Sequence, residues 1–127
     1  MKMVLAIAAG GALGAVARHF AAAQFGQWLG QGFPWGILLV NILGSFLMGA
    51  LVEAMTVAWS PSLELRALLV VGVLGAFTTF STFGFETYAL LADGDWWRAA
   101  ANITVQNTLG LAAVFCGYRI AVLWQSV

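Results

Sequence analysis

The chain has 127 residues, of which 62% are apolar and only 8% are charged, and its formal net charge is zero. A soluble domain carries about 25% charged residues, so this composition excludes a soluble globular protein and indicates an integral membrane protein. The balanced charge gives no reason to expect a nucleic-acid partner. The single Cys116 and the single His19 lack the neighbours that a metal site or a nucleophile–base set needs, so we expect no enzyme.

Four apolar segments are long enough to cross a lipid bilayer, whose core of about 30 Å is spanned by ~20 helical residues. The predicted spans cover residues 3–23, 35–58, 65–92 and 99–123, and short loops rich in Gly, Pro or Asp join them. The fold class we predict is therefore all-α integral membrane. The whole chain forms a single transmembrane domain, with both termini on one side of the membrane.

The first two spans carry small and polar residues at helical spacing. Gly10 and Gly14 form a small-xxx-small pair, which allows another helix to approach closely. Arg18 lies near the far end of the first span, where it is either an interfacial arginine or a vestibule charge that attracts anions. In the second span, Asn41 begins a stripe of small and polar residues at four-residue spacing. The Asn41 side-chain amide serves either to join two helices or to bind a ligand.

The third segment combines glycines with a run of hydroxyl side chains near the expected bilayer midplane. Gly72 and Gly75 precede the run, which indicates a helix that unwinds at its middle and turns its freed backbone groups toward protein or water. A continuous packing helix softened by Ser and Thr is the alternative. Phe80 and Phe83 share a face if the second half is helical. The hydroxyl run consists of Thr78, Thr79, Ser81 and Thr82.

Amides lie on one face of the fourth segment. Asn102 and Gln106 are four residues apart, as are Thr104 and Thr108, so these side chains need partners on other helices or water in a pore. Glu86 follows the expected break by about two helical turns, and we expect it at a water-filled vestibule.

The basic residues give only a weak orientation signal. Lys2, Arg66 and Arg119 fall on the terminal side, and Arg18 and Arg98 fall on the opposite side. Orientation follows the excess of Lys and Arg on one side, and three against two is a small excess. The chain is therefore expected either to insert both ways, which allows an antiparallel homodimer with its site at the midplane, or to adopt one ordinary topology with few charges.

Three motifs in the first three spans closely resemble the CrcB/Fluc fluoride channel family. They are GGALGA at residues 10–15 with Arg18, LVNILGSF at residues 39–46, and GAFTTFSTF at residues 75–83. The resemblance extends over the full length of the chain. The third motif is highly specific, whereas the first two are weak signals alone.

The resemblance implies a dual-topology homodimer with two antiparallel fluoride pores and a broken third helix from each chain at its centre. It implies a structural sodium ion on the twofold axis, held by the backbone carbonyls of Gly75 and Thr78. It also implies that Phe80 and Phe83 line the pores with Asn41, and that the protein exports cytoplasmic fluoride passively across the inner (plasma) membrane.

The chemistry of the residues is compatible with a fluoride path. Hydroxyl and amide hydrogens replace the water of a strongly hydrated anion, and phenyl rings present a positive edge without a full charge. Two departures from the family pattern stand out: Ile37 replaces a frequent Thr, and amides replace Tyr and Ser in the fourth span. The expected path consists of Asn41, Thr79, Phe80, Ser81, Thr82, Phe83, Gln106 and Thr108, with Arg18 and Glu86 in a vestibule.

Two other functions remain as alternatives. A small proton-coupled multidrug transporter has a similar size and dual topology, but it depends on a buried carboxylate in the first span, where this chain has no Asp or Glu. An accessory subunit of a larger membrane complex is the second alternative, and it predicts no ion flux from the purified protein alone.

Overall fold

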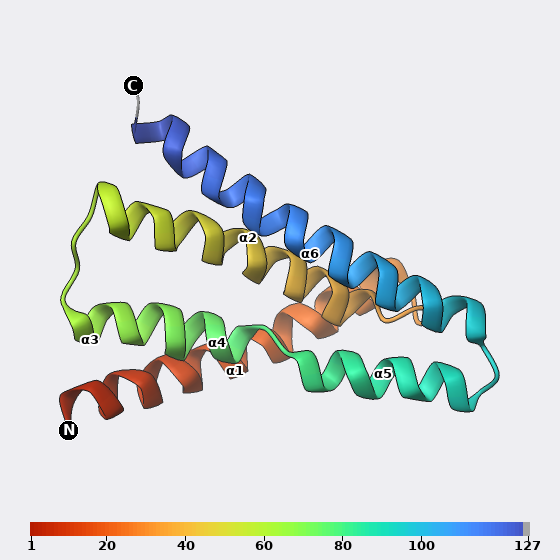
Figure 1. The fold of residues 1–127 in the computed structure, drawn as a ribbon. Coiled ribbons are helices and arrows are strands. Elements are labelled where there is room, and N and C mark those ends of the chain that lie inside the picture. The colour runs from red at the N-terminus through yellow and green to blue at the C-terminus, as the bar shows by residue number, and fades with distance from the viewer. Residues whose placement is uncertain (126–127) are drawn as a thin grey trace.

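The computed structural model of the chain describes residues 1–125, and these residues form helices joined by short connections (Figure 1). Four helical spans are long and apolar enough to cross a membrane, in agreement with the predicted fold class. The N-terminus and the C-terminal end of α6 lie at the left in Figure 1, on the same side as the connection between the second and third spans. In chain order the elements are α1 (Lys2–Leu29), α2 (Trp35–Val57), α3 (Leu63–Arg66), the π-helix η1 (Ala67–Leu74), α4 (Gly75–Phe77), α5 (Phe80–Ala92) and α6 (Trp96–Gln125).

The first helix is longer than the sequence suggested. The predicted span ends at residue 23, but α1 continues to Leu29 and takes up much of the expected loop. The glycine at position 26 is tolerated because it lies in the last turn, whereas Gly30 ends the helix with a φ of 91° and donates its N–H to the Gly26 carbonyl. Glycine content alone therefore misplaced this boundary.

The third span is built from α3, η1, α4 and α5, and it is interrupted at two extended residues (Figure 1). Thr78 and Thr79 have ψ values of 158° and 121°, so the helix stops at one and restarts after the other. The predicted break is thereby confirmed, and the continuous packing helix is wrong. The π-helix before the break was not indicated by the sequence, although π-helical turns are frequent at functional sites.

Glycines set the closest contacts between spans. Gly10 of α1 faces Gly72 of η1, where a Cβ on Gly10 would lie 3.0 Å from the Gly72 Cα and would collide with the Leu68 carbonyl oxygen. Gly14 lies against the Val73 carbonyl in the same way. The two backbones therefore touch directly, as the small-xxx-small spacing predicted, and α1 is packed along the half of the third span that precedes the break.

This contact predicts a large difference between two neighbouring glycines. Gly10→Ala is expected to destabilise the protein by about 1–3 kcal/mol, because the new methyl group overpacks a backbone contact. Gly11→Ala is the matched control, since no heavy atom lies within 4 Å of its Cβ position, and it is expected to be neutral. Thermal unfolding in detergent measures both variants. Equal melting temperatures would contradict the assignment of Gly10 to the contact.

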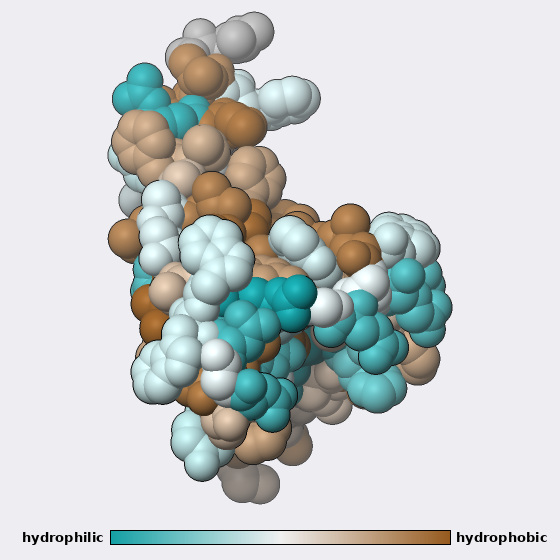
Figure 2. Space-filling model, turned by 90° about the vertical axis from the view of Figure 1, so that its right-hand side faces the viewer, coloured by the Kyte–Doolittle hydropathy of each residue, from teal (hydrophilic) through white to brown (hydrophobic). Residues whose placement is uncertain are grey.

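Hydrophilic side chains gather on the end of the molecule that carries the α1–α2 and α5–α6 connections (Figure 2). Large apolar side chains on the faces are exposed in the protomer, among them Leu111 at 74% and Phe85 at 71%. Lipid or a second protein surface covers such faces in a membrane protein, because water-exposed apolar surface of this extent is unfavourable.

Candidate functional site

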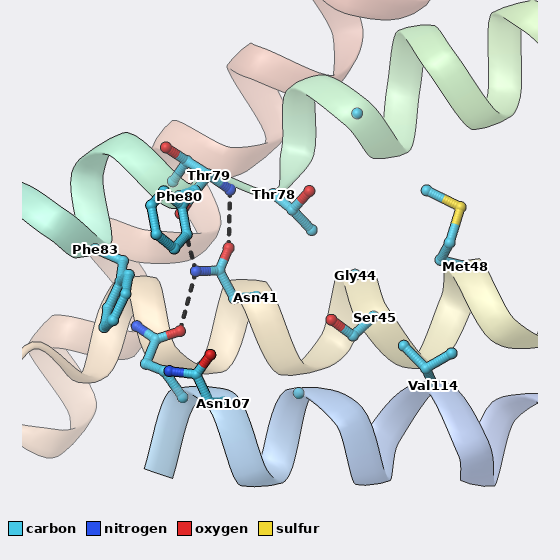
Figure 3. A pocket seen from close by; sticks show the side chains of 13 residues that line it. Asn41, Gly44, Ser45, Met48, Thr78, Thr79, Phe80, Phe83, Asn107 and Val114 are labelled. Carbon is cyan, nitrogen blue, oxygen red and sulfur yellow. Dashed lines mark hydrogen bonds between the residues drawn. The ribbon is translucent and has the colours of Figure 1, made fainter. Parts of the chain in front are cut away.

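The break in the third span is held by the side chain of Asn41 from α2. The Thr79 N–H donates to Asn41 Oδ1 at 2.8 Å, and Asn41 Nδ2 donates to the Thr79 carbonyl at 3.0 Å (Figure 3). The Asn41 carboxamide thus pairs with both the backbone N–H and the backbone carbonyl of Thr79. Because the Thr79 N–H is used in this way, the Gly75 carbonyl loses the partner that a continuous helix would give it.

Arg18 lies at the break and not at the loop end of its span. Its Nη1 donates to the Thr78 carbonyl at 3.2 Å. The position follows from helical spacing, since Gly10, Gly14 and Arg18 are four residues apart and share the face of α1 that packs on the third span. That spacing was present in the sequence and would have located Arg18. Its guanidinium places a positive charge beside the break.

The hydroxyl run caps the second half of the span. Thr79 Oγ1 accepts from the Thr82 N–H at 3.2 Å, and it lies 3.2 Å from Ser81 Oγ and 3.1 Å from Thr82 Oγ1. Thr79 is thus the N-cap of α5, which is a position that favours Thr. The positive end of the α5 dipole therefore points at the break, next to the Arg18 charge.

A cavity of about 410 Å³ opens beside the break, between α2, the two halves of the third span and α6 (Figure 3). Figure 3 shows Phe80, Phe83 and Asn41 at one end of the cavity and Met48 and Val114 at the other. The sequence-predicted path residues that line it are Asn41, Thr79, Phe80, Phe83 and Gln106, and the Gly75 and Thr78 positions border it as well.

The remaining predicted residues lie elsewhere. Thr82 and Glu86 line a second cavity of about 450 Å³, together with residues from the end of α1 and the α1–α2 connection. Ser81 and Thr108 are exposed and line neither of these two cavities. The structure therefore divides the predicted path between a cavity at the break and a vestibule-like cavity nearer the loops, with Glu86 in the second.

The two phenylalanines differ in their environment. Their ring centroids are 5.4 Å apart with an interplanar angle of 60°, so the rings form one tilted pair on α5. The Phe80 side chain is 80% exposed in the protomer, whereas Phe83 is only 8% exposed. Phe80 therefore contributes little to packing within one chain, while Phe83 is buried within the protomer and lines the cavity together with residues of α2 and α6.

The amides of α6 bind to two different elements. Gln106 Oε1 accepts from Asn41 Nδ2 at 3.0 Å, which joins α6 to the break through α2 (Figure 3). The fully buried Asn102 donates to Thr87 Oγ1 at 2.9 Å, and Thr87 in turn donates to the Phe83 carbonyl at 2.8 Å. Thr87 was not among the residues predicted from the sequence, although its position four residues after Phe83 places it on the same face of α5.

Comparison with known proteins identifies the family. The model of the family described as "CrcB-like protein, Camphor Resistance (CrcB)" matches residues 5–118, which include every residue at the break and both cavities. The chain belongs to the CrcB family. The resemblance read from the three motifs is thereby confirmed over nearly the whole length.

Relatives with assigned names match most of the length of this chain. A protein of Rhodospirillum centenum is 47% identical over 94% of this chain and 95% of its own length. A protein of Nitrobacter winogradskyi is 44% identical over 92% and 93%, and one of Hydrogenovibrio crunogenus is 48% identical over 90% and 86%. Each of these three relatives is named "Fluoride-specific ion channel FluC".

Proposed function

We propose that this chain is a fluoride-selective channel that passively exports cytoplasmic fluoride across the inner (plasma) membrane. The observation that carries the proposal is the cavity at the break, where Asn41, Gln106 and the two Phe rings lie together in a chain whose close relatives are named as fluoride channels. The cavity offers polar hydrogens and ring edges without a full charge on its lining. Weak, multiple contacts of this kind suit conduction, because an ion that binds too tightly does not leave.

The electrostatics of the break favour an anion. The N-terminal end of α5 carries about half a positive charge. The Arg18 guanidinium adds a full positive charge at the break, where it donates to the Thr78 carbonyl. The proposed path runs from the vestibule-like cavity with Glu86 to the cavity at the break, where Arg18 donates to the Thr78 carbonyl. Its residues are Asn41, Thr79, Phe80, Ser81, Thr82, Phe83, Gln106 and Thr108.

We propose that two copies associate as an antiparallel homodimer. The cavity at the break is open on the surface of one protomer, and Phe80 and Gly75 on its border are exposed. A second copy that covers this surface would enclose the cavity and shield the freed backbone groups from lipid, which a membrane protein requires.

The proposed structural sodium ion fits the break in part. The Gly75 carbonyl lacks its helical partner and is therefore available to a hard cation, which prefers oxygen ligands. The Thr78 carbonyl already accepts from Arg18 at 3.2 Å, so one of its two lone pairs is engaged. Two carbonyls do not complete a coordination shell, and a twofold-related copy would double their number. When bound, the ion would neutralise carbonyl dipoles at the centre of the dimer.

Liposomes that contain only the purified protein test the function. They are expected to release fluoride at least about a hundredfold faster than chloride, measured with ion-selective electrodes, and without ATP or a proton gradient. Fluoride movement that requires a proton gradient would favour the transporter alternative. Absence of flux from the purified protein would favour the accessory subunit, and equal release of both anions would exclude selectivity.

A further inference from the structure

The carboxamide of Gln106 has one end bound and the other end free. Its Oε1 accepts from Asn41 Nδ2, whereas its Nε2 is buried and has no hydrogen-bond partner within residues 1–125. The Gln106 residue is only 8% exposed and lines the cavity at the break. A buried donor without a partner costs about 1–3 kcal/mol, so a protein retains one only where something else accepts its hydrogens.

The orientation of Gln106 is forced by its neighbours. The Thr79 backbone N–H is a donor only, so the Asn41 atom that faces it must be the oxygen. The other end of the Asn41 amide is then the nitrogen, and it faces both the Thr79 carbonyl and Gln106. Gln106 must therefore turn its oxygen toward Asn41 and its nitrogen away.

The same contacts use up the donors of Asn41. A carboxamide nitrogen carries two hydrogens, and those of Asn41 go to the Thr79 carbonyl and to Gln106 Oε1, each at 3.0 Å. Asn41 has no hydrogen left for an anion unless one of these bonds breaks. This differs from the expectation that Asn41 itself donates to fluoride.

We infer that Gln106 Nε2 is the side-chain donor that meets the anion in this chain, and that Asn41 is a positioning residue that orients Gln106 and holds the break. The inference rests on the proposed fluoride channel and assigns the donor within it. Because Nε2 is already buried and has no acceptor among residues 1–125, an anion that reaches it gains a hydrogen bond without displacing one.

A spectroscopic titration tests the donor directly on the unaltered protein. Glutamine labelled with a heavy nitrogen isotope reports each side-chain amide, and the Gln106 signal is assigned by its absence in Gln106→Met. Sodium fluoride is expected to shift the Gln106 amide signals, and sodium chloride is the matched control that leaves them in place. In Asn41→Asp, Gln106 turns its nitrogen toward the new carboxylate, so the fluoride-induced shift is expected to disappear.

Measurements of fluoride efflux test the role of Gln106 separately from the proposed channel function. Gln106→Met keeps a side chain of similar length without a donor, and its fluoride efflux is expected to fall at least about tenfold, because a hydrogen bond to a charged group is lost. Thr104→Met is the control, since Thr104 is exposed on the same helix and lines neither cavity, and efflux should stay within about twofold of the unaltered protein. If the unaltered protein passes fluoride while Gln106→Met keeps its rate and the Gln106 signals stay in place, Gln106 is not the donor. If the unaltered protein passes no fluoride, the channel function itself is wrong.

Discussion

A protomer that is forced to insert in only one direction is expected to lose fluoride conduction completely. The proposed antiparallel dimer needs both orientations in one membrane, because each protomer would cover the open cavity of the other from the opposite direction. Orientation follows the number of Lys and Arg residues near the loops. A few added lysines should therefore fix the orientation without touching either cavity.

The structure changes the charge count on which this prediction depends. Arg18 is bound at the break to the Thr78 carbonyl, so its charge does not lie with the loops. Arg98 remains at the loop end and is paired with Asp95 at 3.0 Å. The terminal side keeps Lys2 and two arginines, so the bias toward one orientation is larger than the sequence count indicated. A protein that inserts in one direction only is therefore the competing outcome.

Two oppositely biased variants distinguish these outcomes. Ser60→Lys with Gln125→Lys adds charge on the terminal side, and Ala92→Lys with Asp93→Lys adds charge at the opposite end, where both residues are exposed. Each double variant alone is expected to be inactive in fluoride efflux, and co-expression of the two is expected to restore activity. Full activity of either variant by itself would show that the protein works in a single orientation and would exclude the antiparallel dimer.

Much of the fold followed from the sequence because membrane length and local chemistry determine it. Apolar length predicted the spans, and glycines followed by clustered hydroxyls predicted a break near the middle of the third span, which the structure places at Thr78 and Thr79. The small-xxx-small pair in α1 predicted a close contact, which the structure places against η1. These features depend on residues near one another in the chain, where spacing alone shows which side chains share a face.

The hydrogen bonds between helices at the site could not be predicted from the sequence, because they depend on which donor lies near which acceptor in space. Sequence spacing placed Asn41 on a polar face, but it gave no sign that both ends of its amide pair with the Thr79 peptide groups. The hydroxyls of the third span were expected along the path, yet three of them bond to one another at the N-cap of α5. Local capping thus competed with ligand binding, which is the common behaviour of Ser and Thr at a helix start.

Replacing Phe80 by isoleucine is expected to slow fluoride efflux by about tenfold and to leave the fold of the protomer intact. The side chain is 80% exposed in the protomer, so little packing within the chain is lost. An aliphatic chain fills similar space but lacks the positive ring edge that would face the anion. A tenfold change in rate corresponds to about 1.4 kcal/mol, which is comparable with the net contribution of one hydrogen bond, about 0.5–1.5 kcal/mol.

Two companion variants separate the ring edge from packing. Phe80→Tyr keeps the ring and is expected to retain most of the efflux. Phe85→Ile lies on the same helix, and Phe85 is 71% exposed but does not line the cavity at the break, so it should conduct like the unaltered protein. Dimer yield in detergent is measured beside flux in each case, because a weakened dimer would also slow efflux.

Phe83→Ile is the contrasting substitution, because it removes both a buried packing contact and the ring edge. The Phe83 side chain is 8% exposed, so Phe83→Ile loses packing inside the protomer as well as the ring edge. A fall in stability of about 1 kcal/mol is expected together with slower efflux. If Phe80→Ile conducts normally while Phe83→Ile loses efflux only in proportion to its lost stability, both rings are packing residues. The anion would then pass along α6 by way of Gln106 and Thr108.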